Sequence, residues 1–384
     1  MSSGVVLGRF ILRPVRSISC VGRREISGKA LRDPTYKRPK PWPYADKKFT
    51  FFDAFFLRES TTARMDENSK VVVVEGPVAS GTSTVAKKLA EDLDMLYVPD
   101  GHLDMYYINS YGFDTRTLDP EVPESCRSFD IKHFHQDPKN RKVAMMQCLM
   151  YKMRYMQYMK ALAHLMSTGQ GVVLDRSCYS DLVFAEAMFK NEYISKNALD
   201  MYYRFRDNTI TQLLRPHLVV YLDVPVPVTL QNIKKRARPD EKDSKALTEK
   251  FLTDAQDAMK NIYLKDISSH AELLVYDWSS HGDVEVVVED IERLDFDNYE
   301  TEDTKLRDWR DLANEWDWHK YRQLYADKRD WLETFFNVPI HTAPELLIDG
   351  DDAWVYHNAI DNAPGNKFEK GYNADQGDKG IWLK

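Results

Sequence analysis

The chain has 384 residues, of which 43% are apolar and 29% are charged, and its formal net charge is −7. This composition is typical of a globular protein, and the length suits one large domain with extensions or two smaller domains. No apolar run approaches the roughly 20 residues that a membrane-spanning helix needs. The acidic balance argues against a nucleic-acid partner, because phosphate backbones require a basic surface.

The charge is unevenly distributed. Residues 1–48 contain 12 Lys and Arg but only three acidic residues, a balance of +9 that leaves −16 for residues 49–384. The first 24 residues lack acidic side chains, and their arginines alternate with serines and apolar residues. This pattern is typical of a mitochondrial transit peptide, which we predict at residues 1–30; a disordered basic tail is the alternative. Residues 31–69 form an arm, which four prolines within 34–43 should keep extended.

Beyond the arm, predicted strands and helices alternate. The strands are short, unbroken apolar runs, as expected for buried parallel strands. We predict strands at 71–75, 96–98, 172–174, 217–222 and 272–276, and helices at 84–93, 141–167, 179–189, 197–214 and 250–267. This alternation predicts that residues 70–295 form an α/β domain with a P-loop kinase-like fold. In that fold a five-stranded parallel sheet is covered by helices on both faces.

Residues 296–384 differ in character from the domain before them. Six of the eight tryptophans lie after position 304, among many charged residues and without clear periodicity. We predict an irregular extension. Aromatic side chains in a polar segment suit docking to another protein, and packing on the chain's own domain is the alternative.

The four cysteines, Cys20, Cys126, Cys148 and Cys178, are scattered and form no C-x-x-C pair. They fit neither a disulfide framework nor a zinc or iron–sulfur site. We therefore predict no metal site and no electron-carrying role.

The strongest chemical signal is the sequence VVVVEGPVASGTST at residues 71–84. An apolar strand leads through G-x-x-x-x-G into a helix, and this context predicts a loop whose backbone N–H groups bind phosphate. The predicted contact residues are Gly76, Ser80, Gly81, Thr82, Ser83 and Thr84.

Thr82 stands where the full motif has lysine, whereas Ser83 keeps the metal-side hydroxyl. That lysine offsets charge on the transferred phosphate, and loss of one such donor costs on the order of 10² to 10³ in rate. Lys87 and Lys88 begin about 7 Å further along the helix and should point away from the loop. Pro77 also removes one N–H donor. We therefore do not expect efficient phosphoryl transfer.

Three further polar groups follow the predicted strands. Asp100 comes after the second strand, where it could act as a base or simply as a turn residue. Asp175 and Arg176 follow the third strand, either at a ligand site or as a structural ion pair. A basic run at Lys234, Lys235, Arg236 and Arg238 could close over phosphates or form a solvated helix face.

The helix at 141–167 carries a stripe of methionines and tyrosines, which we predict to be core packing. Gln147 and Arg154 lie seven residues apart and thus on one helix face, so they could address one ligand.

Over residues 70–295 these features resemble the deoxynucleoside kinase family. The resemblance assigns the loop at 76–84 to phosphate, Gln147 and Arg154 to substrate recognition, Asp175-Arg176-Ser177 to the motif after the third strand, and Lys235 and Arg236 to a lid. Together with Arg176, these residues would bind a nucleotide. Thr82 departs from the family's lysine, and Asp100 is shorter than its usual glutamate.

A closer resemblance covers nearly the whole chain. Residues 168–181, 216–227 and 371–384 are similar to the kinase-like accessory subunits of mitochondrial respiratory complex I. This implies a non-catalytic subunit for assembly or stability, with Asp100, Asp175 and Arg176 vestigial. It implies a peripheral position on the matrix side of the inner membrane, against other complex I subunits of the proximal membrane arm.

The resemblance also implies that the chain requires no cofactor, although a purine (deoxy)nucleotide can occupy the old kinase pocket. FAD has been ascribed to this family, but the sequence contains no dinucleotide fingerprint that supports it. The alternative function is an active mitochondrial deoxynucleoside kinase in nucleotide salvage.

Overall fold

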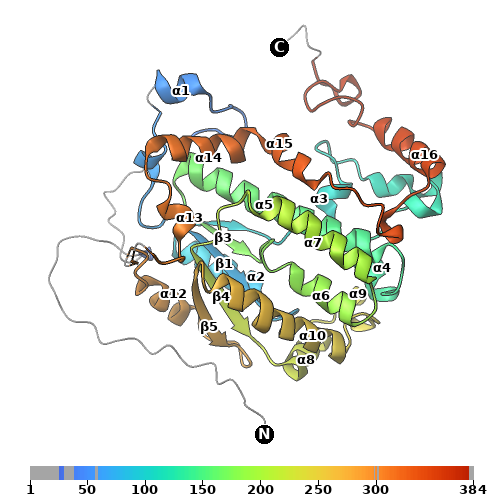
Figure 1. The fold of residues 1–384 in the computed structure, drawn as a ribbon, viewed down its shortest axis with the longest axis horizontal. Coiled ribbons are helices and arrows are strands. Elements are labelled where there is room, and N and C mark those ends of the chain that lie inside the picture. The colour runs from blue at the N-terminus through green and yellow to red at the C-terminus, as the bar shows by residue number, and fades with distance from the viewer. Residues whose placement is uncertain (1–25, 30–38, 57–58, 298, 301, 380–384) are drawn as a thin grey trace, which may run out of the picture.

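The computed structural model describes residues 26–29, 39–56, 59–297, 299–300 and 302–379 (Figure 1). The predicted transit peptide therefore lies outside the described residues, apart from 26–29. None of the described helices is long and apolar enough to cross a membrane.

Five parallel strands form one sheet in the order β2-β3-β1-β4-β5. The strands are β1 (Val71–Glu75), β2 (Leu96–Val98), β3 (Val172–Asp175), β4 (Leu218–Asp223) and β5 (Glu272–Asp277). Strand β1 is central and all its residues are buried, with Val73 paired to Leu174 on one side and to Val219 on the other. The predicted five-stranded parallel sheet is confirmed, with strand ends within about a residue of prediction.

Helices cover both faces of the sheet, as predicted (Figure 1). Alternate residues of β1 point to opposite faces: Val71 and Val73 join one core cluster, and Val72 and Val74 join the other. The first cluster lies under α5 (Val143–Thr168), α6 (Leu182–Lys190), α7 (Lys196–Ile210), α10 (Glu249–Ala258) and α11 (Leu264–Ile267). The second lies under α2 (Thr82–Asp92) and α12 (Val284–Glu292), while α8 (Val226–Arg236) and α9 (Pro239–Lys242) follow β4.

Helix α5 runs through the first core for 26 residues. Its tyrosines and most of its methionines are buried, including Met150, Tyr151, Tyr155 and Met159, which confirms the predicted core stripe. The helix ends because Gly169 takes a left-handed conformation (φ 75°), which glycine adopts without steric cost.

An insert between β2 and α5 carries α3 (Asp104–Tyr107), α4 (Ile131–Gln136) and 3-10 turns at Thr115–Glu121 and Glu124–Cys126. These turns lie against α16 (Gly350–Asp361) of the C-terminal extension (Figure 1). The two segments are more than 200 residues apart in sequence, and a cavity lies between them.

The prediction of an irregular C-terminal extension was wrong. The segment contains α13 (Arg307–Arg310), α14 (Glu315–Asp327), α15 (Arg329–Glu333) and α16. Helix α14 begins because the Asn314 side chain accepts hydrogen bonds from two first-turn N–H groups. Its inward face carries His319 and Arg322 as well as Tyr325 and Ala326, so a search for an apolar stripe does not detect it.

The N-terminal arm, with α1 (Phe51–Phe55), packs on α14. Arg322 of α14 is fully buried, its guanidinium lies 3.9 Å from the ring centre of Phe49, and it donates to Thr61 Oγ1 (3.2 Å). Burial lowers the pKa of Arg322 to about 10. The described part of the arm and the extension therefore stabilise each other. The extension also packs in part on the kinase-like domain, since the Trp309 ring lies 4.1 Å from that of His217.

Candidate functional site

The predicted phosphate loop forms between β1 and α2. Ala79 (φ 60°) and Gly81 (φ 88°) are left-handed, and such conformations turn successive backbone N–H groups toward one point. A Cβ on Gly76 would lie 2.6 Å from Ser80 Oγ and 3.0 Å from Thr82 Cγ2, so only glycine fits there. Because the first-turn N–H groups of α2 have no partner inside the helix, the loop can accept an anion.

Thr82 is the first residue of α2 and is buried, with its methyl group turned toward Gly76. The nearest lysines along the helix are engaged elsewhere. Lys87 Nζ lies 5.4 Å from the ring centre of Tyr97, and Lys88 pairs with Asp92 at 2.8 Å. Neither of these contacts directs a positive charge to the loop.

Asp175 and Arg176 meet the loop from the end of β3. The Ser83 hydroxyl donates to Asp175, and the Arg176 guanidinium donates to the carbonyl oxygen of Pro77 (3.1 Å). Arg176 Nε also lies 3.8 Å from Asp100 Oδ2. Within the described chain Asp175 and Arg176 form no ion pair with each other, so the structural-pair alternative was wrong.

Gln147 and Arg154 both donate hydrogen bonds to Asp181, so they lie on one face of α5, as their spacing predicted. Arg154 holds both oxygens of Asp100, with Nε–Oδ1 at 2.8 Å and Nη2–Oδ2 at 3.0 Å. It also donates to Asp181, which accepts from Gln147 Nε2 (2.8 Å) and the Tyr202 hydroxyl (2.6 Å). Asp100 is therefore a member of a buried ion-pair network rather than a simple turn residue.

The sequence reading missed Asp181, the centre of this network. Its side chain is fully buried, and burial raises its pKa while the charge of Arg154 lowers it. The only signal available was a carboxylate between buried Tyr179 and Leu182 at the start of α6. Phe184 on the same helix lies 5.0 Å from the Arg154 guanidinium, as a cation–π contact.

Glu75 was also missed, although a charged residue at the end of an apolar strand is unusual. It is fully buried and accepts a hydrogen bond from Ser177 Oγ (3.0 Å). Burial raises the pKa of Glu75 to about 7. A carboxyl group of variable charge therefore lies directly before the loop.

The basic run is exposed at the end of α8. Arg236 makes a bidentate ion pair with Glu241, with Nε–Oε2 at 3.0 Å and Nη2–Oε1 at 2.6 Å. Lys235 is exposed, and among the described residues no hydrogen bond or ion pair joins it to the loop. The structure thus does not bring Lys235 and Arg236 into contact with the other predicted site residues.

The loop meets the polar network at the carboxyl ends of β1, β2 and β3. This arrangement suits a ligand with a phosphate at one end and hydrogen-bonding groups at the other. Each oxygen of Asp100 accepts one hydrogen bond from Arg154 and keeps a further lone pair to which a ligand hydroxyl could donate. Among the described residues no group of three or more His, Cys, Asp or Glu could hold a metal ion.

Comparison with known families matches residues 72–312 to the deoxynucleoside kinase model. Deoxyguanosine kinase of Dictyostelium discoideum is 26% identical over 62% of this chain and 74% of its own length. Among solved structures, deoxyadenosine kinase from M. mycoides with bound dATP aligns at a TM-score of 0.44 and 17% identity, over 58% of this chain and 98% of that one.

Longer matches come from mitochondrial proteins. NADH dehydrogenase [ubiquinone] 1 alpha subcomplex subunit 10 of Bos taurus is 37% identical over 86% of this chain and 92% of its own length. The Mus musculus protein of the same name is also 37% identical, over 86% of this chain and 88% of its own. This chain belongs to the deoxynucleoside kinase family and, within it, to the group of NADH dehydrogenase alpha subcomplex subunit 10 proteins.

Proposed function

We propose that this chain is a non-catalytic accessory subunit of mitochondrial respiratory complex I that supports assembly or stability of the complex. The observation that carries the proposal is 37% identity to a named complex I subunit across 333 residues, more than the 295 residues that precede the C-terminal extension. The chain would lie peripherally on the matrix side of the inner membrane, against other complex I subunits of the proximal membrane arm.

The loop supports the proposed lack of catalysis. Thr82 offers no charge to a transferred phosphate, and the cost of one lost donor is on the order of 10² to 10³ in rate. The loop then keeps its fold without efficient phosphoryl transfer.

We further propose that a purine (deoxy)nucleotide binds at this loop without turnover. The loop N–H groups would bind its phosphates. Its remaining polar groups would contact Gln147, Arg154 and Arg176. Lys235 and Arg236 would reach the nucleotide only after a movement of the end of α8. Replacement of Gly81 by Asp tests this placement, because a carboxylate would repel phosphate. Gly112→Asp is the matched control, since both glycines have φ near 87° and both have room for a Cβ. A nucleotide retained by Gly81→Asp would locate it elsewhere.

Exposed aromatic residues supply a docking surface for other subunits. The aromatic ridge consists of Phe51, Phe52, Phe55, Phe56 and Trp316, each more than half exposed. Their rings stack on one another, with Phe51 5.5 Å from Phe55 and 5.8 Å from Trp316. Large exposed apolar clusters on soluble proteins usually mark interfaces. Covering this ridge by another subunit would remove it from water.

Native electrophoresis of mildly solubilised mitochondria tests the proposal, with an in-gel NADH dehydrogenase stain. We expect the chain to co-migrate with the active complex and the active band to weaken on depletion. Migration as a free monomer or dimer, with the complex intact after depletion, would contradict the accessory role. A Phe51→Ser/Phe55→Ser variant should be lost from the complex, whereas Val286→Ser, which removes a half-exposed apolar residue of α12 outside the extension, should not.

The alternative is an active deoxynucleoside kinase, and the assembled network of Asp100, Arg154 and Arg176 at the loop favours it. Transfer of phosphate from ATP to each deoxynucleoside by the purified chain decides between the two. We expect no robust turnover by the unmodified chain. A Thr82→Lys variant should transfer phosphate faster than the unmodified chain if the lysine is the missing element. Robust turnover without that substitution would overturn our ranking.

A further inference from the structure

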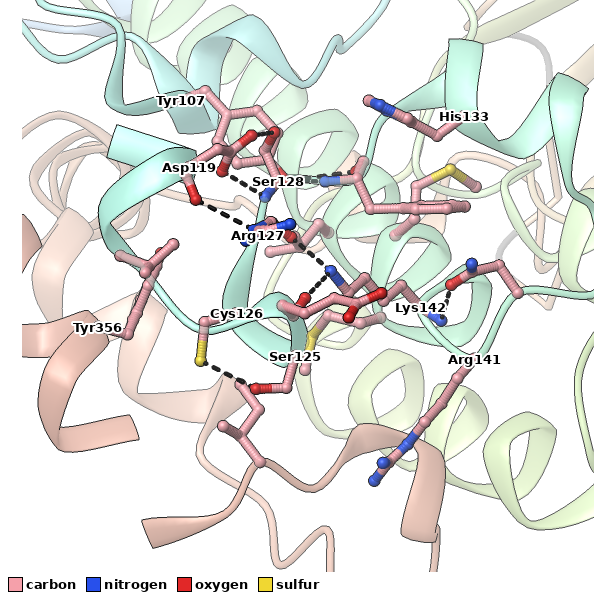
Figure 2. A pocket seen from close by; sticks show the side chains of 18 of the residues that line it. Tyr107, Asp119, Ser125, Cys126, Arg127, Ser128, His133, Arg141, Lys142 and Tyr356 are labelled. Carbon is pink, nitrogen blue, oxygen red and sulfur yellow. Dashed lines mark hydrogen bonds between the residues drawn. The ribbon is translucent and has the colours of Figure 1, made fainter. Parts of the chain in front are cut away.

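A cavity of about 740 Å³ lies between the insert after β2, the start of α5 and the C-terminal extension (Figure 2). Ligand pockets usually measure about 300 to 1,000 Å³. Hydrogen bonds hold the extension against the other two segments. Arg141 donates to the carbonyl oxygens of Pro344 (2.6 Å) and Leu347 (2.9 Å), and Ser125 donates to Asp352. No residue of the phosphate loop or of the Asp100–Arg154–Asp181 network lines this cavity, so it is a separate site.

The floor of the cavity is apolar. Its buried lining residues are Tyr107, Val122, Phe129, Met146 and Leu346, which are 2 to 8% exposed. The one polar side-chain atom among them, the Tyr107 hydroxyl, already donates to the Phe129 carbonyl oxygen (3.2 Å). A nucleobase or sugar needs buried hydrogen-bonding groups. This floor lacks them and suits an aliphatic chain, which flexible methionines accommodate well.

The rim carries three cations, Arg127, Arg141 and Lys142 (Figure 2). All three donate to backbone carbonyl oxygens: Arg127 Nε to Asp119 (3.1 Å), and Lys142 Nζ to Glu124 (2.5 Å) and to Arg127 (3.0 Å). Within the described chain none of the three forms an ion pair with a carboxylate. Burial lowers the pKa of Lys142, while the charges of Asp119 and Glu124 act in the opposite direction. Among the described residues, the rim therefore holds three cations that have no carboxylate partner at ion-pair distance.

The carboxylates around the rim have mainly neutral partners. Asp119 accepts from the backbone and hydroxyl of Ser128 (2.8 and 2.5 Å). Asp137 accepts from an amide side chain at 3.1 Å, and Glu345 from a backbone N–H at 3.0 Å. Glu124 is exposed. Asp119 and Glu124 lie near enough to raise the pKa of Lys142, so an anionic head group would compete with them for this cation.

We propose that this cavity binds an acyl chain with an anionic head group. The chain lies on the apolar floor, and the head group meets Arg127 and Lys142 at the rim. Burial of the chain supplies the affinity, and the two cations select an anion over an uncharged ester. A free fatty acid and an anionic phospholipid share this chemistry.

Titration of the purified full chain with the fluorescent fatty acid cis-parinaric acid tests the proposal. We expect saturable binding of one molecule per chain. Oleate and vesicles of dioleoylphosphatidylglycerol are then added as competitors: displacement by oleate alone identifies a fatty-acid site, and displacement by the phospholipid identifies a phospholipid site. Methyl oleate should compete at least about tenfold less well than oleate, since it lacks the charge. Competition by the ester equal to that by oleate, or displacement by neither lipid, would overturn the proposal.

Two substitutions separate head-group binding from folding. An Arg127→Gln/Lys142→Gln variant should lose about tenfold or more in affinity for oleate but bind methyl oleate as before. Lys132→Gln, on α4 and outside the cavity lining, is the matched control and should bind like the unmodified chain. Met146→Trp should abolish binding by filling the floor, with thermal unfolding as a check on its fold. Unchanged oleate affinity in the double variant would refute the assignment of the head group, whatever the behaviour of Met146→Trp.

Discussion

Glu75 ends β1 with a fully buried carboxyl group, directly before the phosphate loop. Burial raises its pKa from 4.5 to about 7, while the charge of Arg176 and the hydrogen bond from Ser177 act in the opposite direction. Between these two values the folded chain binds a proton that the unfolded chain has lost. The free energy of unfolding must therefore fall as the pH rises through this window.

The size of the effect follows from the two pKa values. A change from 4.5 to about 7 corresponds to a loss of about 3 kcal/mol of stability above pH 7. Glu75→Gln removes the charge and keeps the shape of the side chain. Since Glu75 Oε2 has no hydrogen-bond partner, the amide of the variant stays equally unsatisfied there. We expect the variant to be within about 1 kcal/mol of the parent at pH 5 and more stable by about 3 kcal/mol at pH 8.

Urea unfolding from pH 4.5 to 8.5 measures this difference, with the variant and the parent compared at each pH. The difference between the two curves is the quantity of interest, because other groups titrate equally in both proteins. Glu91→Gln, an exposed position on α2, is the control and should give a difference near zero throughout. A constant difference between pH 5 and 8, or a variant less stable than the parent above pH 7, would refute the reasoning.

Four further substitutions should distinguish positions that do not tolerate a change from one that does, each measured by chemical unfolding. A Cβ on Gly169 would lie 1.9 Å from a backbone oxygen, so Gly169→Ala should lower the free energy of unfolding by at least about 3 kcal/mol. Gly112 is also left-handed, but a Cβ there meets no other atom, so Gly112→Ala should lower it by about 1 kcal/mol. Arg322→Ala should cost about 3 to 5 kcal/mol and expose the N-terminal arm to proteolysis. Asp181→Asn should cost about 2 kcal/mol or more, because it removes the counter-charge of Arg154; equal stability would show the network to be dispensable.

Local pattern predicted most of the kinase-like domain. The apolar runs at β1, β3 and β4 are long enough, and sufficiently β-branched, to identify buried strands without tertiary information. The strand–glycine–helix sequence at residues 71–84 also fixed the phosphate loop, since each requirement of that loop is local. The spacing of Gln147 and Arg154 placed them on one face of α5, as the helical period requires.

Long-range polar contacts could not be predicted in this way. Asp181 and Glu75 matter because burial by distant segments changes their charge energetics, and the sequence at either position records no burial. Arg322 similarly looks like a surface residue of a charged helix until the N-terminal arm encloses it. A polar helix face that packs inward has no periodic signature, which is why α14 was predicted to be irregular.

The sequence by itself determined the sheet class and the glycine-containing loop between β1 and α2, because these depend on neighbours within a few residues. Only the tertiary structure decided the strand order, the partners of Asp100 and the cavity beneath α16. The cavity requires the insert and the extension, more than 200 residues apart, to close on each other. Such contacts depend on the shape and burial of both surfaces, which one-dimensional patterns do not encode.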